Sequence, residues 1–377
     1  MSRRKGLVES AALAAEAAAV WLRDGVIQPL RSKPPHPRAL LFISTHRCNA
    51  RCVMCGIWKE TGTREHELSP DDLDELLADE LFSGLEFVSI NGGEPFVRDD
   101  LAELCRVILR RCPKVKRLSL TTNGLLHRRM RDVLPRISDA VEEAGALLDV
   151  SVSVHGMEKT LDTIYGVENA FTRSRRTVGL LEELREKGRL SFSMNCVLLA
   201  GNLDEARALR SWAAARAIPI TFVIGERRRR FRTEGMDEAF VTEDDEARLV
   251  SFLRQLVDDP EQSAVSADKY REIVDIMEGA KTRTLSCYYA MGGVLLGYDG
   301  VLYYCPHSAA IGDCRERPPA EIYFDPENLA YRRTALFESE CLECPPYTRT
   351  RWEMQKDLPR TLRSMVRRRR SGVGDRT

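Results

Sequence analysis

Three cysteines lie close together near the start of this 377-residue chain, in the stretch HRCNARCVMCGIW. Cys48, Cys52 and Cys55 follow the spacing C-x3-C-x2-C. The chain has 11 cysteines, so chance would place two more at these positions after a given cysteine only about one time in a thousand. Three thiolates in one loop can hold three corners of a 4Fe-4S cluster. Without a fourth cysteine nearby, one iron keeps an open coordination position.

A structural zinc site is the alternative for this loop. Such sites usually close with four protein ligands, and His46 would be the fourth beside the three cysteines. Both interpretations require reduced thiols. Clustered cysteines in a cytosolic chain bind metal or do chemistry more often than they form disulfides.

Composition and charge are those of an ordinary enzyme. Lys plus Arg and Asp plus Glu both total 57, so a formal net charge of zero gives no general attraction to nucleic acid. No run of about 18 apolar residues occurs, which excludes a predicted membrane-spanning helix. The stretch 1–22 imitates a signal peptide, but Glu9 and Glu16 interrupt its alanine-rich part. We therefore interpret residues 1–38 as a helix and linker, and expect a cytoplasmic protein.

Six short apolar runs, rich in β-branched residues, alternate with helical patterns along the chain. They cover residues 39–45, 85–91, 117–123, 147–155, 191–199 and 220–225. Ser69 and Pro70 mark the N-cap and first position of one helix between them. The pattern predicts an α/β fold, a partial (β/α)6 TIM barrel over residues 39–260, with further helices near 242–257 and 268–280.

The loops that leave the predicted strands carry the polar and glycine-rich stretches. In parallel α/β folds these loops gather on one face, where functional sites are built. The three-cysteine loop follows the first strand. The next four strands are followed by NGGEP (91–95), TTNG (121–124), SVHG (153–156) and NCVLLAGN (195–202). We expect one pocket to collect them.

The cysteine loop, followed one βα unit later by NGGEP, resembles the radical S-adenosylmethionine superfamily over residues 39 to about 225. The resemblance implies that the open iron binds the amino and carboxylate groups of S-adenosylmethionine. One-electron reduction, from a donor such as flavodoxin or ferredoxin, then yields a 5′-deoxyadenosyl radical that abstracts hydrogen from the substrate. One departure is Met54, because the residue before the third cysteine is often aromatic in this family. Packing over the adenine is expected to differ accordingly.

The resemblance also implies contacts to S-adenosylmethionine. Gly92 and Gly93 allow close backbone approach to the ligand, and Glu94 accepts a hydrogen bond from its ammonium group. A plain turn is the alternative for this stretch. The residues implied for ribose, carboxylate and nucleoside contacts are Asn123, Ser153 and Asn195.

A second group of cysteines lies toward the C-terminus. Its members are Cys287 and Cys305, separated by 17 residues, and the C-x2-C pair Cys341 and Cys344. Four thiolates would close a second, auxiliary 4Fe-4S cluster. A zinc site is the alternative, although zinc ribbons usually have two C-x2-C knuckles and this chain has one here.

The sequence pattern of the same region resembles the twitch and SPASM extensions of radical S-adenosylmethionine enzymes. GYDG lies between the first two cysteines, as a hairpin turn carried by Asp299 and Gly300, and IGDC follows. We therefore predict a small cysteine-rich domain at 261–350 and a disordered basic tail at 351–377. Cys314 is interpreted as a small buried residue, with a ligand or a hydrogen-atom donor as alternatives.

Other features leave alternatives open. The arginine-rich stretch 226–232 follows the sixth strand and is either a solvated loop or a site for a substrate carboxylate or phosphate. His155 is either a pocket residue or a hydrogen-bonded core residue. The basic tail and the N-terminal stretch permit peripheral membrane contact. The cysteines interpreted as core are Cys105, Cys112 and Cys196.

The sequence thus predicts a radical enzyme that acts on a small molecule or a peptide, by oxidation, epimerisation or cross-linking. No nucleic-acid partner is expected. The alternative is a non-catalytic binding protein on a barrel scaffold, stabilised by zinc or by iron-sulfur clusters.

Overall fold

The computed structural model describes residues 34–60, 63–227, 231–233, 235–259, 264–279, 289, 292–334 and 344. These residues divide between two compact units. The larger unit comprises His36–Arg248 and Gly293–Asn328, and the described residues of 249–292 and of 329 onward belong to the smaller one. Of the predicted N-terminal helix and linker, residues 1–33 lie outside the described residues, as does the whole predicted tail at 351–377.

Six parallel strands follow one another in the larger unit. They are β1 (Ala39–Ile43), β2 (Phe87–Asn91), β3 (Arg117–Thr122), β4 (Leu147–Ser153), β5 (Ser191–Leu198) and β6 (Ile220–Ile224). Each pairs in parallel with the next in chain order, so the predicted series of parallel strands is confirmed. This order is the expected outcome of repeated βα units, whose crossovers place successive strands side by side.

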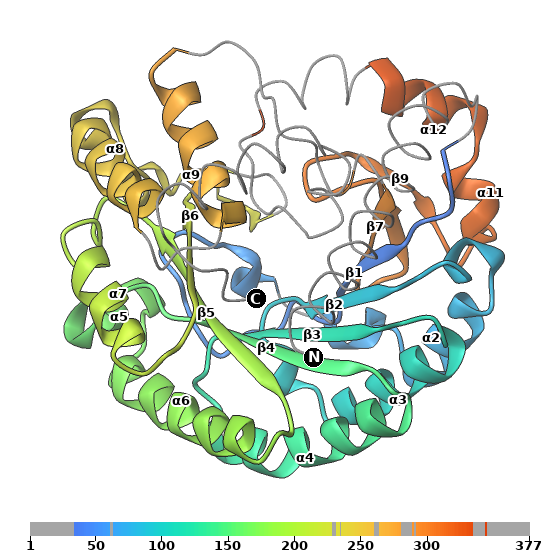
Figure 1. Cartoon of the computed structure of the whole chain (residues 1–377). Helices are drawn as coiled ribbons and strands as arrows, with labels where there is room; N and C mark the ends of the chain where they lie inside the picture. The colour runs from blue at the N-terminus through green and yellow to red at the C-terminus, as the bar shows by residue number, and fades with distance from the viewer. Residues whose placement is uncertain are drawn as a thin grey trace, which may run out of the picture. The chain divides into compact units, whose positions relative to one another are not determined.

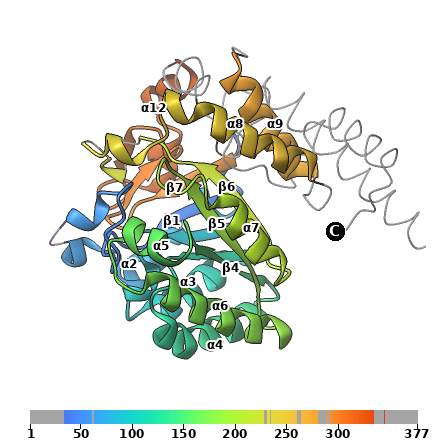
Figure 2. The same ribbon diagram turned by 90° about the vertical axis from the view of Figure 1, so that its left-hand side faces the viewer.

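Helices connect these strands and lie along the outer side of the sheet (Figures 1 and 2). They are α2 (Pro70–Leu77), α3 (Leu101–Arg111), α4 (His127–Glu143), α5 (Glu158–Tyr165), α6 (Ala170–Glu186) and α7 (Ala206–Ala214). Short 3-10 turns include η3 (Ile57–Lys59), η4 (Thr63–His66), η5 (Glu80–Phe82), η6 (Pro95–Val97) and η8 (Asp237–Ala239). The predicted start of α2 is confirmed, because the Ser69 hydroxyl accepts a hydrogen bond from the Asp72 backbone N–H at 3.1 Å.

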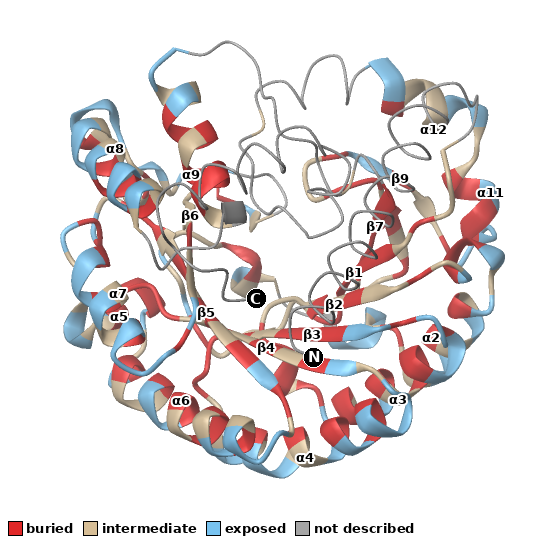
Figure 3. Ribbon diagram, in the orientation of Figure 1, coloured by how far each residue is buried: buried red, intermediate tan, exposed pale blue. Residues whose placement is uncertain are grey.

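Buried and less buried residues alternate along the strands of the sheet (Figure 3). Side chains alternate between the faces of a strand, and on β4 and β5 every second residue is a buried apolar one. The residues between them, such as Ser151, Ser153 and Asn195, are only half-buried. The core therefore lies between the sheet and its helices, and the opposite face of the sheet presents polar groups.

The same sheet continues beyond the six βα units. β7 (Gly293–Leu296) pairs in parallel with β1, and β8 (Val301–Tyr303) and β9 (Ala310–Asp313) add antiparallel strands, which gives a sheet of nine strands within the described residues. The predicted hairpin between β7 and β8 is confirmed, and Gly300 in its turn has a φ of 89°, which favours glycine. Two short helices follow, α11 (Pro319–Tyr323) and α12 (Pro326–Tyr331).

This continuation differs from the predicted domain boundary between residues 260 and 261. Residues 293–328 were expected in a separate cysteine-rich domain, but they belong to the same compact unit as the βα repeats. The physical reason is the free edge of β1, whose unpaired backbone groups are satisfied by β7.

The smaller unit contains the helices predicted after the sixth strand. α8 (Glu243–Asp258) begins in the larger unit and ends in the smaller one, and α9 (Ala264–Met277) follows. Within this unit Arg254 forms an ion pair with Glu278. None of the helices in the described ranges is long and apolar enough to cross a lipid bilayer.

Candidate functional site

The three-cysteine loop leaves the C-terminal end of β1 and is held by backbone hydrogen bonds. Arg51 N–H donates to the carbonyl of Tyr165 at 2.7 Å, and Val53 N–H donates to the carbonyl of Ile164 at 2.9 Å. The Gly56 N–H donates to the carbonyl of Phe231, which follows β6, at 2.6 Å. The loop therefore rests on the end of α5, which itself follows β4.

The NGGEP stretch packs against the backbone that leads into the cysteine loop. Gly93 N–H donates to Thr45 O at 2.7 Å, and Glu94 N–H donates to Arg47 O at 2.9 Å. A Cβ on Gly92 would lie 2.3 Å from Thr45 O, and one on Gly93 would lie 2.3 Å from Arg47 O. The predicted close approach thus exists, but it is to the chain's own backbone. Approach to a ligand stays a prediction.

We expect Gly93→Ala to lower the free energy of unfolding by about 1–3 kcal/mol, because the added Cβ meets backbone that cannot move aside. Gly179→Ala is the matched control. Gly179 lies inside α6 with nothing within 4 Å of an added Cβ, so alanine there should stabilise the protein by about 0.5–1 kcal/mol. Urea unfolding of both variants tests this, and equal effects would contradict the close approach.

Glu94 is fully buried and ties the loop after β2 to the loop after β3. Its Oε1 accepts from the Thr122 hydroxyl at 2.8 Å and from Phe96 N–H at 3.2 Å. Its Oε2 accepts from Asn123 N–H at 2.7 Å, which leaves one acceptor position on that oxygen. Burial raises the pKa of Glu94 to about 7, although these three hydrogen bonds act in the opposite direction. The predicted contact to an ammonium group stays a prediction.

His155 is buried in the core beside the end of β4. Its Nδ1 accepts from Val197 N–H at 3.1 Å, and its ring meets Tyr165 edge-on with the ring centroids 5.5 Å apart. Burial lowers its pKa to about 3, so the ring is neutral at physiological pH. These contacts favour the core interpretation over a pocket residue.

Glu94 and His155 affect the pH dependence of stability in opposite directions. Glu94 has a raised pKa, so its contribution is complete below about pH 4.5 and is lost as the pH rises to about 7. His155 has a lowered pKa, so its contribution is complete above about pH 6.5 and is lost as the pH falls toward 3. Between pH 4.5 and 6.5, Glu94 makes the free energy of unfolding fall as the pH rises, and His155 makes it rise.

We therefore expect His155→Asn, which keeps an acceptor for Val197 N–H, to show the pH dependence of the unfolding free energy that comes from Glu94 alone. The variant should lose about 3 kcal/mol of unfolding free energy between pH 4.5 and 7, a range in which the wild type changes less. Urea unfolding at several pH values measures the slope. The exposed His66→Asn is the control and should keep the wild-type profile. A wild-type profile for His155→Asn as well would refute the expectation.

Asn123 links the loop after β3 to the first cysteine. Its Oδ1 accepts from Leu125 N–H at 2.9 Å, and its Nδ2 donates to Asn49 Oδ1 at 2.8 Å. The same Nδ2 lies 3.8 Å from Cys48 Sγ. The structure therefore brings Asn123 and Cys48 together, as the common pocket required.

Ser153 and Asn195 are brought together at a second place. They pair in register across β4 and β5, and Asn195 Nδ2 donates to the hydroxyl of Ser151 at 2.9 Å. Tyr165, whose carbonyl holds Arg51, also donates its hydroxyl to the carbonyl of Ser153. This tyrosine connects the end of β4 to the cysteine loop, and its position at a helix end before Gly166 was its one signal in the sequence.

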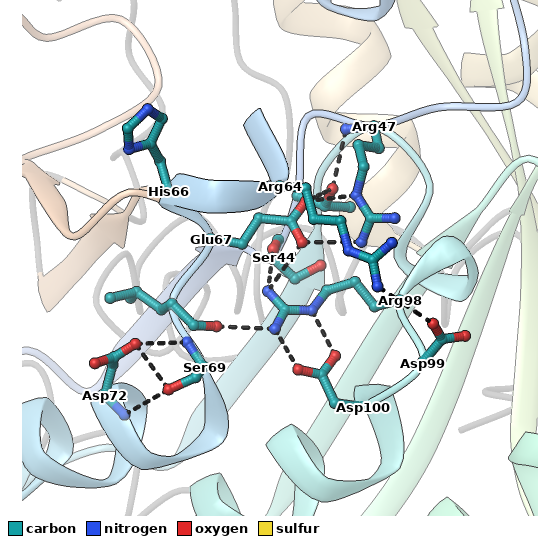
Figure 4. Close-up of polar contacts among 12 residues, drawn as sticks. Ser44, Arg47, Arg64, His66, Glu67, Ser69, Asp72, Arg98, Asp99 and Asp100 are labelled. Carbon is teal, nitrogen blue, oxygen red and sulfur yellow. Dashed lines mark hydrogen bonds and ion pairs between the residues drawn. The ribbon is translucent and has the colours of Figure 1, made fainter. Parts of the chain in front are cut away.

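A network of charged side chains fixes the residues just before Cys48 (Figure 4). Glu67 accepts from Arg47 at both oxygens, each at 2.9 Å, and also from the Thr45 hydroxyl. The Glu67 side chain is only 5% exposed. The backbone carbonyls of Thr45 and Arg47 accept hydrogen bonds from the NGGEP stretch, and their side chains donate to Glu67. The segment that leads into Cys48 is therefore held both through its backbone and through its side chains.

Arg98 is the buried centre of this network. Its guanidinium donates to the carbonyl of Ser44 at 2.7 Å, to that of Leu68 at 2.8 Å, and to both oxygens of Asp100. It also lies 3.8 Å from Glu67. Burial would raise the pKa of Asp100, but the hydrogen bond and charge of Arg98 outweigh it and the pKa is lowered. Sequence reasoning missed Glu67 and Arg98, which are ordinary loop residues until they are buried.

The thiols of the loop fit an iron-sulfur cluster. Burial raises the pKa of Cys48 to about 11, and burial also raises the pKa values of Cys52 and Cys55. Such thiols stay protonated unless a cation favours the thiolates, which the irons of a cluster supply. None of the three forms a disulfide, and Cys48 Sγ accepts from Ala50 N–H at 3.4 Å. Three free thiols in one loop, the first of which accepts a backbone N–H, are a donor set that fits a cluster.

The zinc alternative for this loop requires His46 as fourth ligand. His46 Nδ1 lies 2.6 Å from Glu60 Oε2, and the ring centroid lies 4.3 Å from that of Tyr298. Among the residues that the structure describes, no three His, Cys, Asp or Glu side chains converge on one point as ligands of a single ion. The His46 ring thus contacts Glu60 and Tyr298, and the described structure does not show it converging with the three cysteines on one metal ion.

The second cysteine group is only partly described. Cys287 and Cys341 lie outside the described residues, and Cys344 is half-buried. Cys305 is buried, and its Sγ accepts from His307 N–H at 3.4 Å, as Cys48 accepts from the residue two positions on. The four-cysteine site stays a prediction.

The remaining cysteines are buried, in agreement with the core interpretation. Burial raises the pKa of Cys314 to about 12, and its N–H donates to the carbonyl of Gly300 at 3.0 Å. The other buried cysteines are Cys105, Cys112 and Cys196.

Two arginines of the stretch 226–232 are paired within the chain. Arg227 lies 2.6 Å from Asp237, and Arg232 forms an ion pair with Glu60. Arg228, Arg229 and Arg230 lie outside the described residues.

A cavity of about 870 Å³ opens beside the cysteine loop. Its lining includes Arg51, Cys52 and Trp58 from the loop, Lys159 from α5 and Met236. The loop is thus reachable from this side by small solutes.

A family model decides the identity of this region. Residues 42–213 match the model of the Radical SAM superfamily. These residues form a radical SAM domain. It contains the cysteine loop, the NGGEP stretch and β2 to β5, so the resemblance seen in the sequence is confirmed for this part of the chain. The match does not extend to the second cysteine group.

Several curated proteins are similar to this chain. GTP 3′,8-cyclase from Listeria welshimeri is 31% identical over 186 residues, which are 48% of this chain and 51% of the relative. Fe-coproporphyrin III synthase from Methanosarcina barkeri is 30% identical over 174 residues, 46% of this chain and 40% of the relative. The chain thus spans about half the length of the curated relatives it matches.

Solved structures share the fold. Streptococcus suis SuiB bound to S-adenosylmethionine has a TM-score of 0.57 at 15% identity, over 79% of this chain and 68% of SuiB. A structure of anSMEcpe with AdoMet and a peptide has the same TM-score and identity, over 88% of this chain and 98% of that protein. The radical SAM domain therefore has the α/β arrangement of proteins in which S-adenosylmethionine is bound.

Proposed function

We propose that this protein cleaves S-adenosylmethionine reductively to a 5′-deoxyadenosyl radical and abstracts a hydrogen atom from a substrate. The observation that carries the proposal is the loop of Cys48, Cys52 and Cys55, three half-buried free thiols inside a radical SAM domain. The six parallel strands act as a partial barrel whose C-terminal ends carry the site.

In this proposal Cys48, Cys52 and Cys55 hold a 4Fe-4S cluster. When bound, the cluster supplies one electron to the sulfonium of S-adenosylmethionine, which separates into methionine and the radical. The protein's own part is to hold the thiolates and to keep the loop still through Glu67 and Arg98.

The contacts to S-adenosylmethionine are proposed for residues at the ends of β2 to β5. The loop of Gly92, Gly93 and Glu94 is proposed to contact the methionine portion, with the remaining acceptor position of Glu94 Oε2 available for the ammonium group. The other proposed contacts are Asn123, Ser153 and Asn195. Their half-buried or buried polar groups at strand ends support this assignment.

The substrate is proposed as a small molecule or a peptide, and the electron donor as a flavodoxin or ferredoxin. The curated relatives are named for GTP and coproporphyrin chemistry, and anSMEcpe is solved with a peptide. Because the match covers about half of those relatives, their substrates do not decide among these classes.

We further propose an auxiliary 4Fe-4S cluster in a twitch- or SPASM-like region, with Cys287, Cys305, Cys341 and Cys344 as ligands. Support comes from Cys305, which accepts an N–H from two residues on, as Cys48 does. The buried Cys314 is interpreted as a core residue and serves as its control.

Anaerobic reconstitution tests the proposal. The wild type should bind about eight irons per chain and form 5′-deoxyadenosine with dithionite. Cys305→Ala should lower the count to about four, whereas Cys314→Ala should leave it at about eight. A chain that takes up zinc and forms no 5′-deoxyadenosine would favour the binding protein instead.

A further inference from the structure

The side-chain amide of Asn49, between the first two cysteines of the loop, has an unused donor. Its Nδ2 is buried and has no hydrogen-bond partner, although the residue itself is half-buried. A buried donor without an acceptor is unfavourable, so native proteins rarely keep one without a reason such as a bound group.

The orientation of this amide is fixed by a chain of hydrogen bonds. Leu125 N–H can donate only to an oxygen, which settles that the Asn123 oxygen faces Leu125. The Asn123 nitrogen then faces Asn49 at 2.8 Å, where it requires an oxygen as acceptor. The Asn49 nitrogen must therefore point the other way. Its lack of a partner is a property of the fold and not an ambiguous amide assignment.

The neighbours of Asn49 indicate what the missing acceptor is. Cys48 Sγ already accepts from Ala50 N–H at 3.4 Å, and Asn123 Nδ2 lies 3.8 Å from the same sulfur. N–H groups thus gather around the first cysteine. Sulfur atoms of an iron-sulfur cluster accept such bonds, and hydrogen bonds to them tune the reduction potential.

We propose that Asn49 Nδ2 donates a hydrogen bond to a sulfur atom of the cluster held by this loop, and that Asn123 holds it in that orientation. The inference rests on the proposed function. Asn49 thereby raises the reduction potential, because an N–H donor stabilises the extra negative charge of the reduced cluster, and Asn123 is the positioning residue.

The test is Asn49→Leu, which keeps the size of the side chain and removes its donor. The matched control is Asn169→Leu, the same change at an exposed position. The measurement is a redox titration of the cluster without S-adenosylmethionine, monitored by the EPR signal of the reduced cluster. The signal that belongs to this loop is the one that shifts when S-adenosylmethionine is added afterwards. At a fixed potential we expect about a tenfold lower ratio of reduced to oxidised cluster in Asn49→Leu, which corresponds to about 59 mV for one electron. Asn169→Leu should match the wild type.

The outcomes separate this inference from the proposed function. An unchanged potential with full iron would overturn the inference, as would an unchanged potential with weaker S-adenosylmethionine binding, because the donor would then serve the ligand. Wild-type protein without any S-adenosylmethionine-responsive cluster would overturn the proposed function itself.

If Asn49→Leu fails to fold, the wild type still tests the inference. Pulsed EPR of the reduced cluster, in protein labelled with 15N at the asparagine side-chain amides, should show two 15N couplings, one from Asn49 and one from Asn123, whose Nδ2 lies 3.8 Å from Cys48 Sγ. A single coupling, or none, would overturn the proposal.

Discussion

Alanine at Cys48, Cys52 and Cys55 together is expected to abolish formation of 5′-deoxyadenosine and to leave about four of eight irons per chain. These cysteines are half-buried, and the desolvation of their thiols raises the pKa of each, so they are thiolates only when a cation is bound. Without them the open iron has no place on the protein. Iron and sulfide assays and chromatography of the reaction mixture measure both effects.

Cys105→Ala is the matched control for this prediction. Cys105 is a buried thiol in α3 whose pKa burial raises to about 12, but it lies outside the cysteine loop. The variant should keep full iron and full product. Product from the triple variant would show that the site lies elsewhere in the chain.

Arg98→Met is expected to lower the free energy of unfolding by about 3–5 kcal/mol and to weaken iron retention. The substitution removes the partner of Asp100 and leaves Glu67 with Arg47 as its remaining cation. It also strips the carbonyls of Ser44 and Leu68 of a donor. Because Glu67 holds Arg47 and Thr45, the cysteine loop should loosen at its start.

Arg106→Met is the matched control. Arg106 pairs with Glu103 at 3.2 Å on the surface of α3, with side chains 40% and 48% exposed. Water screens such a pair, so the variant should change stability by about 0.5 kcal/mol or less. Urea unfolding and iron release to a chelator compare the two variants. Equal effects would refute the role given to the buried network.

Features that depend on neighbouring residues in the sequence were predicted well, and features that depend on contacts between distant segments were not. Strand periodicity and the cap at Ser69 are local, and β1 to β6 and α2 lie close to where the sequence predicted them. The joining of residues 293–328 to the sheet depends on which edge β7 finds, a contact between segments over two hundred residues apart. Local patterns carry no information about that choice.

The cysteine loop shows the same division at the scale of the site. The sequence by itself determined the thiols and the stretch NGGEP, because their spacing is set by the chemistry they would do. Only the tertiary structure decided which groups hold that loop. Glu67, Arg98 and Tyr165 become part of the site through burial and long-range hydrogen bonds. The orientation of Asn49 was decided in the same way, because it depends on Asn123, which is 74 residues away in the chain.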